Sequence, residues 1–284
     1  MKIYLFIILV SFSLNSIFAQ SKWKRSEEIV EAPFTIFKSP QTLNLHTAEV
    51  LPRGDLFYGI SHRFNGPVSD GYSTFFGLDN GAAMRTELAY GINDKMMITL
   101  ARANREANHD LQFKYKFYQT KSLGLPLMFA VNLGAAYISN PQIERSDKSE
   151  QFQYFGTVII NAMLFDKLAI GVTPTFLHNT IAFADCKTYS LNIGSYIQYY
   201  LGDDMTSFIL EGANTVSGWR GNGTTPFYDT YSFGVEFETG GHFFKLLLSN
   251  SNFLNQSQIL GGSPNVFKLD NLVFGFQITR NFGL

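Results

Sequence analysis

The feature that most constrains this fold is a series of short segments in which apolar and polar residues alternate. In one of them the apolar residues are Leu111, Phe113, Tyr115 and Phe117. The positions between them are polar: Asp110, Gln112, Lys114 and Lys116. Because successive side chains of a β-strand point to opposite faces, this segment has one oily face and one polar face.

The same pattern recurs along the chain and predicts strands near 54–63, 82–90, 96–103, 109–119, 126–137, 151–164, 167–177, 187–201, 205–214, 228–239, 242–249 and 269–282. The connections are alternately long and short, and the tight turns carry the Gly, Asn and Asp that hairpins need. Many strands of about ten residues with this alternation are typical of outer-membrane barrels. We expect an all-β fold, a transmembrane up-and-down antiparallel β-barrel of about 12 strands, with 10–14 possible.

Closure of the sheet follows from the solvent. An unpaired backbone N–H or C=O in hydrocarbon costs several kcal/mol, so an open sheet edge cannot face lipid. An even strand count places both chain ends on the periplasmic side. Phe282, near the end of the chain, resembles the C-terminal aromatic signal read by the barrel-insertion machinery, although Gly283 and Leu284 follow it.

The first residues predict export. Lys2 precedes an apolar run, and a small residue, Ala19, lies before the expected cut, so residues 1–19 read as a cleavable signal peptide. An uncleaved membrane anchor is the alternative. With the barrel pattern, this predicts the outer membrane of a Gram-negative bacterium, with outer-membrane lipid as a partner. The single cysteine, Cys186, excludes an internal disulfide.

Residues 20–53 differ in composition from the barrel that we expect over 54–284, because they combine a charged start with three prolines. Residues 34–51 are predicted to enter the lumen as a plug, with Leu43, Leu45 and Val50 as contacts. A periplasmic tail or an additional edge strand is the alternative.

Charged residues fall on the faces opposite the oily ones. The predicted lumen-lining residues are Arg63, Arg85, Glu87, Lys114, Lys116, Glu211, Glu236 and Glu238. They comprise four bases and four acids, so the lumen has no dominant sign. Such charges tune selectivity in a water-filled pore, or they pair across a narrow interior and hold the barrel together.

The first long loop, 64–81, is a candidate constriction. Folded inward, its aromatic residues Tyr72, Phe75 and Phe76 could narrow the pore, and Asp79 lies beside them in the sequence. Packing of this loop against the barrel wall is the alternative. The spacing of its acidic residues is not that of an EF-hand.

The sequence offers little chemistry. Its five histidines form no metal-spaced pair, so we expect no metal. No nucleotide or nucleophile motif is present, so we expect no cofactor and no enzyme. A net charge of −1 gives no case for nucleic acid. A barrel-embedded lipid-modifying enzyme is the less favoured alternative; its best histidine, His62, adjoins Ser61, but neighbours in a strand face opposite ways.

Three elements resemble a known family. They are TAEVLPRGDLFYGISHRF (47–64), FFGLDNGA (75–82) with Arg85 shortly after, and AYGIND (89–94). They are similar to a domain-of-unknown-function family of outer-membrane β-barrels from the Bacteroidetes, most clearly over about 38–135. The resemblance implies the fold and the membrane location but no substrate or activity. It highlights His62, Arg63, Gly77, Leu78, Asp79 and Arg85, and suggests an Asp79–Arg85 ion pair.

Together these features predict a passive, selective or gated channel for small solutes of unknown identity. A structural or assembly barrel without transport activity is the main alternative.

Overall fold

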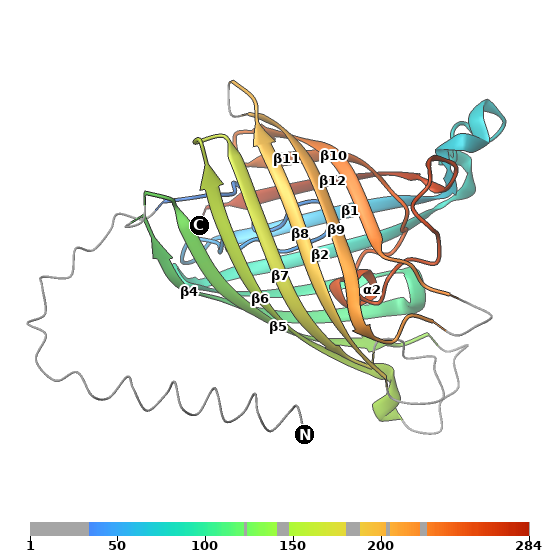
Figure 1. Cartoon of the computed structure of the whole chain (residues 1–284), viewed down its shortest axis with the longest axis horizontal. Helices are drawn as coiled ribbons and strands as arrows, with labels where there is room; N and C mark the ends of the chain where they lie inside the picture. Colours follow the sequence, from blue (N-terminus) through green and yellow to red (C-terminus); the bar gives the residue numbers. More distant parts are fainter. Residues whose placement is uncertain are drawn as a thin grey trace, which may run out of the picture. The chain divides into compact units, whose positions relative to one another are not determined.

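The barrel is closed by twelve antiparallel strands, each paired with its neighbours in sequence and β12 with β1 (Figure 1). The computed structural model describes residues 34–121, 124–140, 148–179, 188–202, 205–221 and 226–283. The strands are β1 Leu56–Pro67, β2 Ala82–Asn93, β3 Met96–Ala103, β4 Asn108–Thr120, β5 Leu127–Ile138, β6 Phe152–Leu164, β7 Leu168–His178, β8 Tyr189–Tyr200, β9 Thr206–Gly218, β10 Thr230–Thr239, β11 His242–Ser249 and β12 Val273–Phe282. The predicted strand count and up-and-down order are confirmed. The predicted signal peptide lies outside the described residues.

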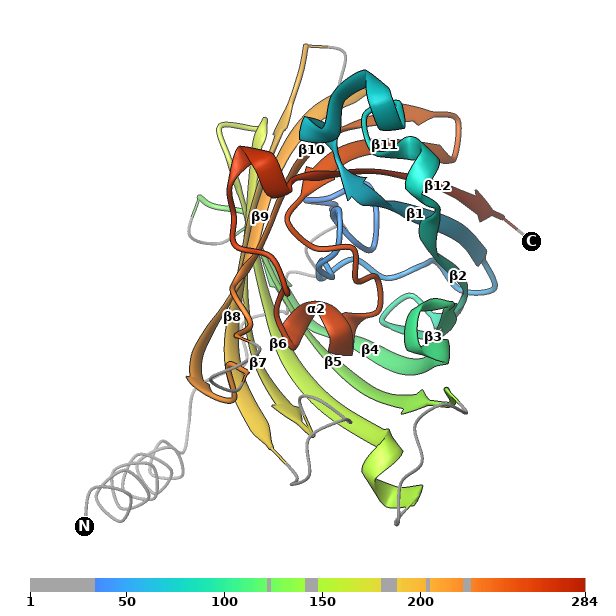
Figure 2. The same cartoon turned by 90° about the vertical axis from the view of Figure 1, so that its right-hand side faces the viewer.

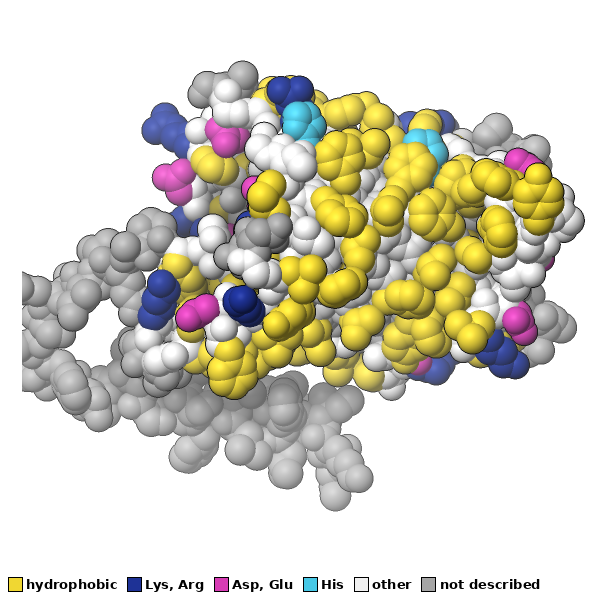
Figure 3. All heavy atoms as spheres, turned by 90° about the horizontal axis from the view of Figure 1, so that it is seen from above, with side chains coloured by type: hydrophobic (Ala, Val, Ile, Leu, Met, Phe, Trp, Pro, Cys, Tyr) yellow, Lys and Arg dark blue, Asp and Glu magenta, His cyan; other side chains and the backbone are white. Residues whose placement is uncertain are grey.

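The distribution of apolar and polar side chains on the barrel wall is the reverse of that in a soluble protein: the apolar side chains face outward and the polar ones face inward. Along β8, the outward Leu191, Ile193 and Ile197 are 41–45% exposed, while the inward Asn192 and Gln198 are 2% exposed. Apolar side chains cover much of the visible outer surface (Figure 3). Because apolar groups are stable in contact with hydrocarbon and polar groups are not, this surface suits a lipid bilayer.

The two rims differ in their connections. In the described part of the chain, the short helices all lie in the connections at one end of the barrel: η2 Val68–Thr74, η3 Leu78–Asn80, η4 Arg105–Ala107, η5 Lys148–Gln151, α2 Gln256–Leu260 and η6 Leu269–Asn271. We call this end the long-loop rim and the other end the short-turn rim. Within the described part of the chain, no helix is long and apolar enough to cross a membrane.

Residues 34–52, the N-terminal inserted segment, lie inside the barrel (Figure 2). Almost every residue between 36 and 51 is buried, and Leu43 and Leu45 are at most 1% exposed. Val50 packs at the edge of a cluster with Leu51 and Phe57. The charged start of the predicted 20–53 segment lies outside the described residues.

A second segment also enters the barrel. Residues 250–263 of the β11–β12 connection, the inserted loop, are buried throughout and carry α2 (Figure 2). The sequence pattern leaves 250–268 between two predicted strands, and nothing in it indicated that this connection turns inward. Asn255 begins α2 with a reciprocal capping box, in which its side chain and that of Gln258 each bond the other's backbone N–H. Both ends of the bore are therefore occupied by the chain itself.

Gly91, near the end of β2, tests how tightly the N-terminal inserted segment joins the wall. A Cβ at Gly91 would overlap the carbonyl oxygen of Pro52, whereas one at Gly202 would meet nothing. Gly91→Ala is therefore expected to destabilise the barrel by about 1–3 kcal/mol, as overpacking does. The measurement is the temperature at which the heat-modifiable gel band converts. A melt unchanged from wild type, or equal to that of Gly202→Ala, would contradict this contact.

Candidate functional site in the barrel interior

The eight charged residues predicted to line the lumen all occupy inward positions of their strands. Six of them are at most 7% exposed: Arg63, Arg85, Glu87, Lys114, Glu211 and Glu236. Lys116 and Glu238 are half-buried nearer the short-turn rim, where Glu238 pairs with Lys38 of the N-terminal inserted segment at 2.9 Å. Two further buried charges of the strands, Asp110 and Lys245, were not among the predicted lumen residues.

Two lysines bind the backbone of the N-terminal inserted segment. The Lys114 Nζ of β4 donates to the carbonyl oxygens of Pro40, Thr47 and Glu49 at 2.7, 2.9 and 3.0 Å. The Lys245 Nζ of β11 donates to those of Gln41 and Thr42 at 2.7 and 2.8 Å. Each ammonium thus replaces its water shell with carbonyl oxygens of one short turn.

Glu211 of β9 binds the same turn as an anion: it accepts hydrogen bonds, whereas the two lysines donate them. Its Oε2 accepts from the Thr42 hydroxyl at 2.7 Å and from the N–H groups of Leu43 and Asn44 at 3.1 Å. The Asn44 amide also donates to Oε1, and the Asn44 Oδ1 accepts from Arg63 at 2.7 Å. Cations and an anion of the wall therefore hold residues 40–49 from several strands at once.

Arg85 and Glu87 of β2 form a buried ion pair at 2.6 Å. Glu87 also accepts from the side chain of Gln41 at 2.7 Å. The Asp79–Arg85 pair suggested by the family resemblance is wrong, because Asp79 is exposed in η3 while Arg85 points into the barrel. A second buried pair joins Lys245 to Glu236 at 3.0 Å.

The inserted loop is held by β2, β4 and η4. The Arg85 Nε donates to the Asn255 Oδ1 at 2.9 Å, and the Asn255 amide donates to the backbone oxygen of Asn108 at 3.1 Å. At the long-loop rim the Gln258 amide donates to Glu106 at 3.1 Å. Burial raises the pKa of the Glu106 carboxyl, while the Gln258 bond and the Arg105 charge lower it.

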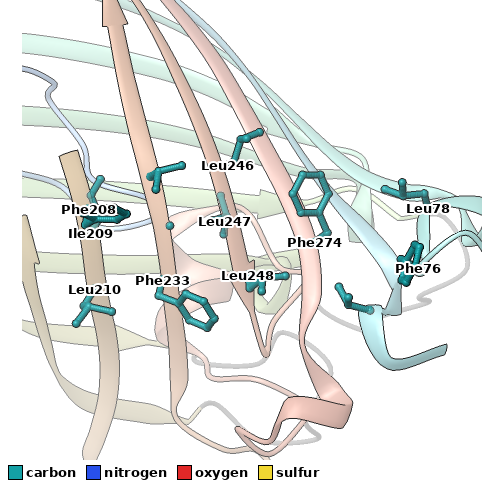
Figure 4. A pocket seen from close by; sticks show the side chains of 13 residues that line it. Phe76, Leu78, Phe208, Ile209, Leu210, Phe233, Leu246, Leu247, Leu248 and Phe274 are labelled. Carbon is teal, nitrogen blue, oxygen red and sulfur yellow. The ribbon is translucent and has the colours of Figure 1, made fainter. Parts of the chain in front are cut away.

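The aromatic residues of loop 64–81 do not narrow the bore. Tyr72, Phe75 and Phe76 are 83%, 52% and 47% exposed, so the predicted constriction is wrong. Phe75 and Phe76 adopt left-handed backbone conformations at the end of η2. Phe76 lies outside the barrel with Leu78 and the outward Phe274, at a hollow of about 650 Å³ on the outer wall (Figure 4).

The described histidines belong to no metal-binding group. No group of three or more His, Cys, Asp or Glu there could hold a metal ion. His62 stacks on Phe276 on the outer wall, whereas Ser61 is buried on the inner face. His109 lies 3.2 Å from the Ser139 hydroxyl, which also donates to the Ala107 carbonyl at 2.9 Å.

The main interior residues that the sequence analysis did not predict are Lys245 and those of the inserted loop. Lys245 lies in the run HFFKLLLS, where apolar residues occupy both faces and weaken the alternation. The polar side chains of 250–263 have the composition of an ordinary turn. The strand period would have found Lys245, since it faces the same way as the inward Phe243.

Comparisons with known proteins agree with this architecture. A family model described as a membrane bound beta barrel domain (DUF5777) matches residues 37–282, while the Bacteroidetes origin stays a prediction. An outer membrane channel from Pseudomonas putida F1 is similar, at 11% identity and a TM-score of 0.53, over 83% of this chain and 98% of that one. The NanC porin is similar at 10% identity and a TM-score of 0.50, over 81% and 100%. No curated protein sequence matches the chain.

Proposed function

Because this chain belongs to the DUF5777 family of membrane bound beta barrel domains, we propose that it is an outer-membrane channel for small solutes, closed at rest by its two inserted segments. Export depends on residues 1–19, and the short-turn rim faces the periplasm of a Gram-negative bacterium. Barrel-insertion machinery and outer-membrane lipid are its expected partners.

One observation carries this proposal: the bore is filled by separate chain segments that bind a polar wall. A bore filled by strand side chains alone could open only if the wall itself rearranged. Here the ties to residues 40–49 are hydrogen bonds and ion contacts from Lys114, Lys245 and Glu211. Water can replace such bonds one for one when the segment leaves, and no strand pairing has to break. The N-terminal inserted segment can therefore leave the bore while all twelve strands stay paired.

The size of the barrel supports a narrow passage. Eight strands enclose an interior that side chains fill, and barrels of sixteen or more strands leave an aqueous channel. Twelve strands lie between these cases. The lumen-lining charges are balanced in sign, so selection by net charge alone is not expected.

Deletion of residues 21–45 tests the proposal. The deletion removes the turn held by Lys245 and Glu211 while leaving the signal and all strands intact. We expect discrete conductance steps in planar bilayers that are larger and more frequent than those of the wild type. Heat-modifiable gel mobility serves as the control for folding. Identical conductance in the two proteins would contradict a closing role for the segment.

Two other functions give different results in the same preparation. A structural or assembly barrel would show no steps even after the deletion and would copurify with a partner. A lipid-modifying enzyme, which we do not expect, would turn over phospholipid or lipopolysaccharide. That turnover would be lost on His62→Ala or Ser139→Ala.

A further inference from the structure

The inner wall of the barrel is divided into a charged part and an uncharged part. The buried charged side chains of the strands lie on β1, β2, β4, β9, β10 and β11. Strands β5, β6, β7 and β8, which the structure describes completely, contain no Asp, Glu, Lys or Arg. Because these four strands are consecutive in the barrel, their inner faces form one continuous surface, which we call the neutral wall.

The neutral wall presents amides and hydroxyls to the interior. Its buried polar side chains include Asn132, Thr157, Asn161, Thr173, Thr175 and Asn192. Some bond each other, as do Thr157 and Thr175 at 3.0 Å. The Asn132 Oδ1 and the Thr173 Oγ1 are buried without a hydrogen-bond partner. A buried polar atom without a partner is costly, so these two atoms mark positions where a polar guest or water is favoured.

The inserted loop packs against this wall and is uncharged as well. Residues 249–265 contain no charged residue, and their buried side chains include Asn252, Gln256 and Ser257. Leu260 packs against Phe155 and Leu177 of the neutral wall. The Ser257 hydroxyl also lacks a partner. The boundary between loop and wall is therefore uncharged on both sides and incompletely bonded.

We propose that the neutral wall is the binding path for a neutral polyhydroxylated solute of the sugar class, reached when the inserted loop withdraws. The assignment rests on the proposed channel function. Hydroxyl groups both donate and accept hydrogen bonds, as amides and threonine hydroxyls do. An ionised solute on the same surface would lose hydration without meeting an opposite charge, which is costly.

Liposome swelling tests this assignment with a variant that combines the 21–45 deletion with Asn255→Ala, which removes the Arg85 contact of the inserted loop. Three solutes of similar size are compared: glucose, gluconate and glucosamine. We expect glucose to enter about fivefold faster than either ion, a factor that corresponds to one net hydrogen bond of about 1 kcal/mol. Gluconate or glucosamine entering as fast as glucose would overturn the assignment. Normal conductance without preference refutes only the substrate class, whereas no conductance and no swelling refutes the channel as well.

Two isosteric substitutions locate the path. Thr173 on β7 and Thr279 on β12 are both inward, buried and without a partner for the hydroxyl. Thr173→Val is expected to slow glucose entry about fivefold with ion conductance unchanged, while Thr279→Val leaves glucose entry unchanged. Equal effects of the two variants would overturn the assignment.

A variant with a new negative charge on the neutral wall tests the path through the ratio of glucosamine entry to glucose entry, which does not depend on the loss of a hydrogen bond. Asn192 bonds the hydroxyls of Ser190 and Thr215, and both hydroxyls can donate to a carboxylate at that position. Asn192→Asp is expected to raise glucosamine entry relative to glucose entry. An unchanged ratio of the two rates, with folding verified by gel mobility, would contradict passage along the neutral wall.

Discussion

Replacing Lys114 and Lys245 together with methionine is expected to open the bore. The two ammoniums donate five hydrogen bonds, at 2.7–3.0 Å, to carbonyl oxygens of residues 40–49. Hydrogen bonds to charged groups contribute about 1.5–3 kcal/mol each, and methionine makes none of them. Loss of even two would shift the closed-to-open ratio by about 10²–10⁴-fold. Single-channel recording would show this as a rise in open probability.

The design of this experiment must account for Glu236, which Lys245→Met would leave without its ion pair. The variant therefore also carries Glu236→Gln, whose amide keeps a bond to neighbouring polar groups. Lys95→Met with Lys167→Met is the matched control, because it removes two exposed lysines at the short-turn rim. An open probability equal to that of this control would show that the lysines do not hold the segment.

Asn255→Ala is expected to release the inserted loop at the long-loop rim. The side chain caps α2 and accepts a bond from the buried Arg85 guanidinium at 2.9 Å. Loss of an N-cap costs about 1 kcal/mol, and loss of a bond to a charged group adds about 1.5–3 kcal/mol. Hydrogen exchange over residues 250–263 is the measurement, since local opening governs it.

The control for this prediction is Asn271→Ala. Asn271 lies in the same connection, in η6, and its amide bonds the Val266 carbonyl at 3.0 Å. We expect exchange over 250–263 to rise in Asn255→Ala and to match the wild type in Asn271→Ala. Equal protection in all three proteins would mean that Asn255 does not anchor the loop.

The strands could be predicted because side-chain direction in a strand is local. Asp110, Gln112 and Lys114 alternate with apolar residues, and the structure has these three side chains buried and inward. The inward positions of Arg63 and Glu211 follow from the same period of two. Where apolar residues occupy both faces, as around Lys245, the contrast between the faces is weak, and Lys245 was not predicted although the strand period places it on the inner face.

The aromatic loop shows a second limit. Tyr72, Phe75 and Phe76 are aromatic residues close together in the sequence, and apolar side chains predict burial only where the surrounding solvent is water. Beside a lipid-facing wall the same side chains are stable outside the barrel, as Phe76 is beside Phe274. Hydrophobicity alone therefore cannot tell whether such a loop turns inward or outward.

The amino-acid sequence by itself determined the all-β class, the number of strands and which faces of them are polar, because each of these depends on neighbours within a few residues. Only the tertiary structure decided what fills the bore. Asn255 meets Arg85 across 170 positions of sequence, and Lys245 meets Gln41 across 204. Such partners are brought together by closure of the barrel, which places β1 beside β12 and gives buried amides and charges the hydrogen bonds that their burial requires.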